Sequence, residues 1–167
     1  SWIAKDTPPM ISEPKMPPLA DILAHIVVTT VPDWDSFVGW EAALLDDAFR
    51  DSPHLDSLAD KLFTGADSTW EKVFRVHEYL MEDIRYQQDY ENHIAGVKPH
   101  PATVVVQRGY GDCKDKAVLF IALARRAQID VHFSLVRTMN KGTVIKDTPM
   151  QQFNHAIVFV PKQEGIE

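Results

Sequence analysis

Apolar residues recur at helical spacing in three successive stretches of the chain after residue 33. Each stretch begins at a residue that can cap a helix: Asp33 or Asp35 for the first, Ser52 for the second and Ser68 for the third. Glu71 follows Ser68 at the spacing of a capping box. The pattern therefore predicts three helices. The positions expected to face the core are Phe37, Val38, Trp40, Leu44, Leu45 and Phe49; Leu55, Leu58, Leu62 and Phe63; and Trp70, Val73, Phe74, His77, Leu80 and Met81.

The second half of the chain changes from helical to alternating periodicity. Residues 117–124 are apolar on every side, which predicts a central helix covered by other elements. Residues 129–138 and 153–160 are strand-like and are separated by a turn and a loop, and residues 101–107 suit a short helix. A helical N-terminal half and a central helix followed by a small antiparallel sheet predict an α+β fold.

The first 32 residues have a different character. Five prolines between Pro8 and Pro18 predict an extended connector. Residues 26–31 are largely β-branched and end at Pro32, as in a strand or an extended segment. We therefore place a linker, or the end of a preceding domain, in residues 1–32 and the core in residues 33–167.

Composition and charge narrow the classes of partner. A net charge of -7 and a pI of about 5.4 argue against nucleic acids, which need a basic face, and against acidic membrane surfaces. The single cysteine excludes an internal disulfide, and we find neither a bilayer-length apolar run nor a signal peptide. Because the chain begins without methionine, we expect flanking domains of a longer protein. The compartment stays open, and a secreted or periplasmic location is compatible with the sequence.

The single cysteine, Cys113, lies within residues 108–117, Arg-Gly-Tyr-Gly-Asp-Cys-Lys-Asp-Lys-Ala. The glycines interrupt regular structure and Asp112 can cap a helix, so that Cys113 lies one step inside it. Unpaired N–H groups at a helix N-terminus favour a thiolate, and Lys114 and Lys116 add positive charge nearby. A lone cysteine is often only a small buried hydrophobe. These polar neighbours favour a nucleophile instead.

His155 is a candidate partner of Cys113, although the two are far apart in the sequence. It lies early in the strand predicted after the cysteine helix, and a strand beside that helix can bring the two side chains together. An imidazole in that place would take the thiol proton and later protonate a leaving amine. The alternative is an interior strand histidine with no chemical role.

The other histidines do not form a metal-binding pattern. His93 and His100 lie in the polar loop of residues 87–100, but closely spaced histidine and cysteine ligands of the zinc type are missing. His77 falls on a predicted core stripe, where a core histidine is expected rather than a ligand. We therefore expect no metal, and we interpret the loop as a solvated surface at the mouth of a cleft, where substrate can be selected.

Two segments resemble the bacterial transglutaminase-like superfamily, a branch of the papain-like cysteine enzymes: residues 111–117, Gly-Asp-Cys-Lys-Asp-Lys-Ala, and residues 153–158, Phe-Asn-His-Ala-Ile-Val. The resemblance runs from about Trp34 to Val160. It implies a papain-like transglutaminase core, and a β-rich domain of unknown function commonly precedes such a core. The implied activity is acyl transfer from an amide of a peptide or protein substrate, through a thioester and without a cofactor. Whether water or a lysine-type amine accepts the acyl group stays open.

A catalytic pair also needs an oxyanion donor and a group that orients the histidine. The backbone N–H of Cys113 is the natural first donor, because it points out of a helix N-terminus. Tyr86 and Tyr110 are candidates for the second donor, and each is alternatively a packing residue. Asn154 is a candidate to orient His155.

The third member of the implied triad is not identified in the sequence. The resemblance implies an aspartate on the strand after His155, but the only acids after it are Glu164 and Glu167. Asp130 and Asp147 precede the histidine and do not fit the family order, although the fold could still bring one of them to His155. We therefore expect the core to be truncated at its C-terminus. This fragment would be impaired, because loss of such an acid can cost about ten-thousandfold in rate.

Two other functions remain as alternatives. The first is a catalytically weak or inactive module that keeps the fold and holds a peptide in its cleft. The second, a thiol redox sensor, is less favoured because the chain contains no resolving cysteine.

Overall fold

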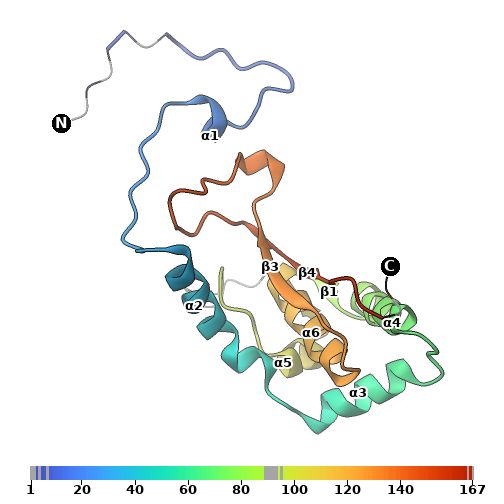
Figure 1. Ribbon diagram of the computed structural model, residues 1–167. Helices are drawn as coiled ribbons and strands as arrows, with labels where there is room; N and C mark the ends of the chain where they lie inside the picture. The colour runs from blue at the N-terminus through green and yellow to red at the C-terminus, as the bar shows by residue number, and fades with distance from the viewer. Residues whose placement is uncertain are drawn as a thin grey trace.

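A central helix, α6 (Cys113–Arg126), runs through the core, and most of the core elements pack around it (Figure 1). The computed structural model describes residues 3, 5, 6, 8–88, 94, 96–164 and 166. None of the helices in these residues is long and apolar enough to cross a membrane. In chain order the elements are α1 (Leu19–Ile22), α2 (Trp34–Leu45), a 3-10 helix η1 (Asp46–Phe49), α3 (Pro53–Phe63), α4 (Thr69–Glu82), β1 (Arg85–Tyr86), α5 (Ala102–Arg108), β2 (Tyr110–Gly111), α6 (Cys113–Arg126), β3 (His132–Val136), a 3-10 helix η2 (Met139–Lys141) and β4 (His155–Phe159).

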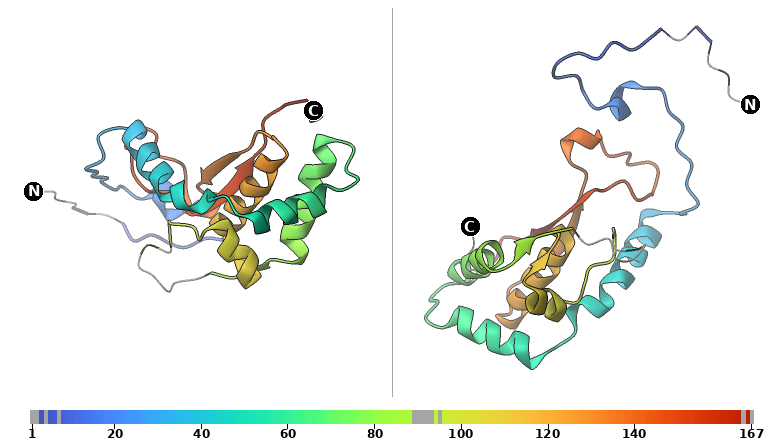
Figure 2. Two further views of the ribbon diagram at one scale, coloured as in Figure 1. Left: turned by 90° about the horizontal axis from the view of Figure 1, so that it is seen from below. Right: turned by 180° about the vertical axis from the view of Figure 1, so that it is seen from behind.

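The prediction of a covered central helix is confirmed by the burial of α6. Every residue from Lys114 to Ala124 is buried, with the exception of Lys116. Helices α3, α4 and α5 contact α6, and strands β3 and β4 pack against it as well (Figure 2). A helix that is apolar all round needs partners on all sides, and this arrangement supplies them.

The three predicted helices begin at their predicted caps. The side chains of Asp33, Ser52 and Ser68 each accept a backbone N–H of the first turn that follows. At the third helix, however, the carboxylate of Glu71 accepts the N–H of Asp67 at 3.0 Å instead of that of Ser68. The capping box predicted there is therefore only half formed.

The prediction of which residues of α4 are buried is wrong in part. The buried side chains are those of Val73, Val76 and Leu80. Four predicted core positions are exposed instead: Trp70 (58%), Phe74 (48%), Met81 (64%) and His77. The reason is that α3 and α6 cover only one narrow stripe of α4, and the neighbouring stripe lines an open groove. Two positions of α2, Val38 and Trp40, are likewise exposed.

The strands form two small sheets within the described residues. β3 and β4 are antiparallel, in a register that pairs His132 with Phe159 and Val136 with His155. β1 and β2 are parallel and bring Tyr86 opposite Gly111. The predicted antiparallel sheet is therefore present, and His155 is the first residue of its second strand.

The segment before the core runs from α1 to α2 as an extended chain. Residues 24–33 pair with no strand in the described structure, so of the two predicted conformations, strand and extended segment, the second is found. The side chains of this segment instead make hydrogen bonds to the loop that precedes β4. Linker and core are thus in direct contact.

Glu41 on α2 is a buried carboxyl that should make stability depend on pH. It is only 8% exposed, its Oε1 accepts a hydrogen bond from Gln151 at 3.1 Å, and burial raises its pKa. A raised pKa in the folded state means that this group opposes folding once it is ionised. We therefore expect Glu41→Gln to stabilise the protein at pH 7, while the two proteins should differ little well below the ordinary value of 4.5. Urea unfolding of both proteins at pH 7 and well below pH 4.5 tests this. An equal difference in the free energy of unfolding at the two pH values would contradict it.

Candidate active site

Cys113 is the first residue of α6, at the position that the sequence predicts. Asp112 is the N-cap, and its Oδ1 accepts the N–H groups of Lys114 at 3.1 Å and Asp115 at 3.4 Å. The carboxylate of Asp115 accepts the N–H of Asp112 at 3.2 Å in return, which completes a capping box. Cys113 is half-buried and free. Its thiol is therefore held on a rigid helix end, where a negative charge is favoured.

The approach to Cys113 depends on two glycines with different roles. Gly109 ends α5 with a φ of 66°, a left-handed conformation that few other residues adopt. Gly111 is packed so closely that an added Cβ would lie 2.7 Å from the Cβ of Asp115. Gly109 thus allows the left-handed turn out of α5, and Gly111 leaves the space that the Asp115 side chain occupies.

The two lysines beside Cys113 are both engaged by other groups. Lys114 is buried and its ammonium bonds to the carboxylate of Asp112, so its charge is compensated there and the expected support for the thiolate from Lys114 is not found. Lys116 donates to the carbonyl oxygen of Leu80 at 2.7 Å, and burial lowers its pKa. Lys116 does line the same groove as Cys113.

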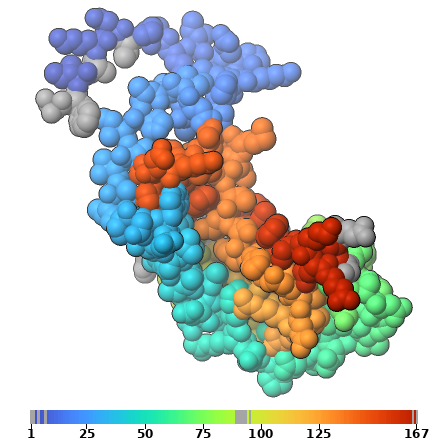
Figure 3. All heavy atoms as spheres, viewed as in Figure 1, coloured from blue at the N-terminus to red at the C-terminus, as the bar shows by residue number. Residues whose placement is uncertain are grey.

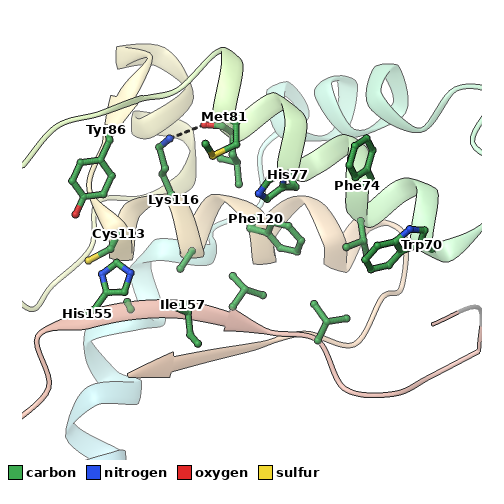
Figure 4. Close-up of a pocket in the computed structure, with 16 residues that line it drawn as sticks. Trp70, Phe74, His77, Met81, Tyr86, Cys113, Lys116, Phe120, His155 and Ile157 are labelled. Atoms are coloured by element: carbon green, nitrogen blue, oxygen red, sulfur yellow. Dashed lines mark hydrogen bonds between the residues drawn. The ribbon is translucent and has the colours of Figure 1, made fainter. Parts of the chain in front are cut away.

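His155 faces Cys113 across the gap between β4 and the start of α6. In the close-up the imidazole and the thiol are neighbours, although one comes from a strand and the other from a helix (Figure 4). Both side chains line one open groove of about 730 Å³. The structure thus brings together the two residues that sequence reasoning paired.

The groove extends from this pair between α4 and β4 and is mainly apolar. Its part away from Cys113 is lined by Trp70, Phe74 and Phe120 (Figure 4), and the first two lie on the face of α4 that was expected to be buried. The volume is within the range of about 300–1,000 Å³ that is usual for ligand sites. A nucleophile and a base at the end of such a groove make a candidate active site.

Comparison with known proteins agrees with this geometry. A family model described as the transglutaminase-like superfamily matches residues 56–163, which is more than half of the chain and includes both Cys113 and His155. The chain belongs to the transglutaminase-like superfamily.

One solved structure with this transglutaminase-like fold is a crystal structure from Parabacteroides distasonis described as a putative protease. The TM-score is 0.55 at 17% sequence identity, and the match covers 71% of this chain and 24% of that one. At this identity the likeness shows the fold alone. The chain thus spans about a quarter of the length of that protein. A search of curated proteins gave no match.

Of the two tyrosines considered as oxyanion donors, the transglutaminase-like chain brings Tyr86 to the thiol. Burial raises the pKa of Tyr86, and the neighbouring Cys113 raises it further. Tyr86 stands beside Cys113 because β1 pairs with β2 in parallel (Figure 4). The Tyr110 ring instead contacts two guanidinium groups, whose Cζ atoms lie 5.7 Å (Arg85) and 5.8 Å (Arg108) from its centroid.

Asn154 does not orient the imidazole by a hydrogen bond. Its Oδ1 accepts the N–H of Thr138 at 2.9 Å, and its Nδ2 donates to the hydroxyl of the same residue at 2.8 Å. Its backbone N–H donates to Val136 at 3.1 Å. Asn154 therefore closes the loop between β3 and β4 and fixes the backbone next to His155.

In the described part of this transglutaminase-like chain, no acid is hydrogen-bonded to the ring of His155. Asp130 lies at the other end of β3, where it contacts His132 Nε2 at 3.4 Å. Within the described residues, neither Asp147 nor Glu164 makes a hydrogen bond or ion pair with His155, and Glu167 lies outside those residues. The third member of the triad stays a prediction.

Sequence reasoning missed the interaction of two residues at the N-terminus of α6, Asp115 and His100. Asp115 is 1% exposed and also accepts the N–H of His100 at 2.8 Å, while the His100 ring lies 3.3 Å from its carboxylate. The spacing of Asp112 and Asp115 was the available signal, since it is that of a capping box. His93 lies outside the described residues, and those that are described contain no cluster of three or more metal ligands.

Proposed function

We propose that this transglutaminase-like chain carries out thiol-dependent acyl transfer on peptide or side-chain amides. The observation that carries the proposal is the pairing of Cys113 and His155 at one end of an apolar groove. A nucleophile, a base within reach and an adjoining ligand-sized groove are the elements that such a reaction requires.

The reaction would proceed through a thioester in two stages. His155 takes the proton from Cys113 Sγ, and the thiolate attacks the amide carbonyl carbon. The backbone N–H of Cys113 and the hydroxyl of Tyr86 stabilise the oxyanion that forms. The carbon–nitrogen bond then breaks, and the amine leaves with the proton that His155 held. Water or a second amine then attacks the thioester carbonyl carbon and gives a proton to His155; the carbon–sulfur bond breaks, and His155 returns the proton to the Cys113 thiolate, which completes hydrolysis or transamidation.

A catalytically weak or inactive peptide-binding module is the second candidate. The observation that favours it is that, within the described residues, no acidic side chain forms a hydrogen bond with the ring of His155. Without such a partner an imidazole is less well oriented and a charged imidazolium is less stable. The groove alone would then serve to hold a peptide.

Acyl trapping distinguishes the two candidates. The folded protein is mixed with a 4-nitrophenyl ester, and intact-mass and peptide mass spectrometry locate the acyl group. We expect one acyl group on Cys113, formed faster than on the urea-unfolded chain, and no acylation of this site in Cys113→Ser. Equal rates for the folded and unfolded chains would argue against an activated nucleophile and favour the binding module.

A further inference from the structure

A segment that runs from α1 to the first residue of α2 contacts the loop that leads into His155. We name residues 20–34 the strap, and Figure 3 shows this region of the chain packed against the loop of residues 142–153. The N–H of Thr143 donates to Asp21 Oδ1 at 2.7 Å. Gly142 permits this approach, because an added Cβ would lie 2.8 Å from the same oxygen. The first contact of the strap thus depends on a glycine in the loop.

Two further hydrogen bonds join the strap to the loop nearer to His155. The hydroxyl of Thr29 donates to the carbonyl oxygen of Pro149 at 2.7 Å, and the Trp34 indole Nε1 donates to that of Lys146 at 2.7 Å. Both acceptors are main-chain groups, so these bonds set the path of the loop backbone. The ring of Trp34 also lies 6.2 Å from that of Phe153, two residues before the histidine.

The loop itself is cross-linked by hydrogen bonds, so that a displacement at one point affects its other parts. The Gln152 side chain accepts from the N–H of Ile145 at 2.8 Å and donates to its carbonyl oxygen at 3.0 Å. Arg137 donates to the carbonyl oxygens of Gln152 at 3.1 Å and Gly142 at 2.9 Å. A shift of the loop where the strap holds it is therefore passed on to Gln152, and from there to Phe153, Asn154 and His155.

We infer that Trp34 and Thr29 are positioning residues for His155, acting through the loop. Neither residue lines the groove that contains Cys113 and His155. The catalytic consequence rests on the proposed function, whereas the placement of His155 does not. Because a displacement of 1 Å can cost about a hundredfold in rate, a loosened strap should weaken the pair without changing either of its members.

The test uses Trp34→Phe, which removes the indole donor, and Thr29→Val, which removes the hydroxyl at nearly constant shape. Trp40→Phe is the matched control, because Trp40 lies on the same helix, is 45% exposed, and its indole makes no hydrogen bond to the described part of the chain. Ring signals of His155 are followed against pH by NMR with ¹⁵N-labelled histidine, assigned with His155→Gln. The rate of Cys113 alkylation by iodoacetamide is measured over the same pH range.

We expect Trp34→Phe to shift the His155 ring signals and their pH dependence, and to slow alkylation at neutral pH by about three- to tenfold. Thr29→Val should act in the same direction, and it decides the question if Trp34→Phe does not fold. Unchanged His155 signals in a folded strap variant would overturn the inference. Shifted signals combined with an alkylation rate that does not respond to His155→Ala would keep the strap and overturn the proposed function instead.

Discussion

Replacing His155 by alanine is expected to slow the reaction of Cys113 with iodoacetamide at neutral pH by about tenfold or more. Only the thiolate reacts, and a cysteine without a base is a few per cent thiolate at pH 7. In this chain the imidazole faces the thiol and can accept its proton (Figure 4). The measurement is the second-order alkylation rate of the folded protein between pH 5 and 9, chosen to span the ordinary histidine and cysteine pKa values of about 6.5 and 8.5.

The matched control for this prediction is His132→Ala. His132 lies at the opposite end of the same sheet, and its side chain is 57% exposed. The His132→Ala substitution should leave both the rate of Cys113 alkylation and the pH profile of that rate unchanged. If His155→Ala also leaves them unchanged while the protein stays folded, the imidazole does not act on the thiol, and the catalytic interpretation fails.

Replacing Asp112 by alanine is expected to lower the free energy of unfolding by about 3–5 kcal/mol, as is typical when one partner of a buried ion pair is removed. A helix cap alone would account for about 1 kcal/mol. The larger effect is expected because Lys114 is 6% exposed and bonds to the Asp112 carboxylate, so its charge would be left buried without that partner. Urea unfolding at pH 7 measures the loss.

A double variant separates the ion pair from the cap. Asp112→Ala combined with Lys114→Met removes the buried charge together with its partner, so it should regain most of the lost stability and retain the cost of the missing cap. A loss near 1 kcal/mol in the single variant would mean that the ion pair contributes little. If the double variant is no more stable than Asp112→Ala, the unpaired charge of Lys114 does not lower the free energy of unfolding.

The sequence by itself determined the features that depend on neighbouring residues. The starts of α2, α3 and α4 follow from Asp33, Ser52 and Ser68, because a cap acts within one helical turn. The place of Cys113 at a helix N-terminus follows in the same way from the capping residue Asp112. The pairing of Cys113 with His155 could not be inferred from neighbouring residues alone, because it rested on the resemblance of two motifs to a known family.

Only the tertiary structure decided which groups meet across the fold. Tyr86 rather than Tyr110 reaches the thiol because β1 pairs with β2, and such pairing joins segments that are distant in the sequence. Periodicity shows that one side of a helix is apolar, but the width of the buried stripe depends on its partners. That is why Phe74 of α4 is exposed. The contact of the strap with the loop before His155 has the same origin: its hydrogen bonds join Thr29 and Trp34 to backbone groups, which no side-chain pattern marks.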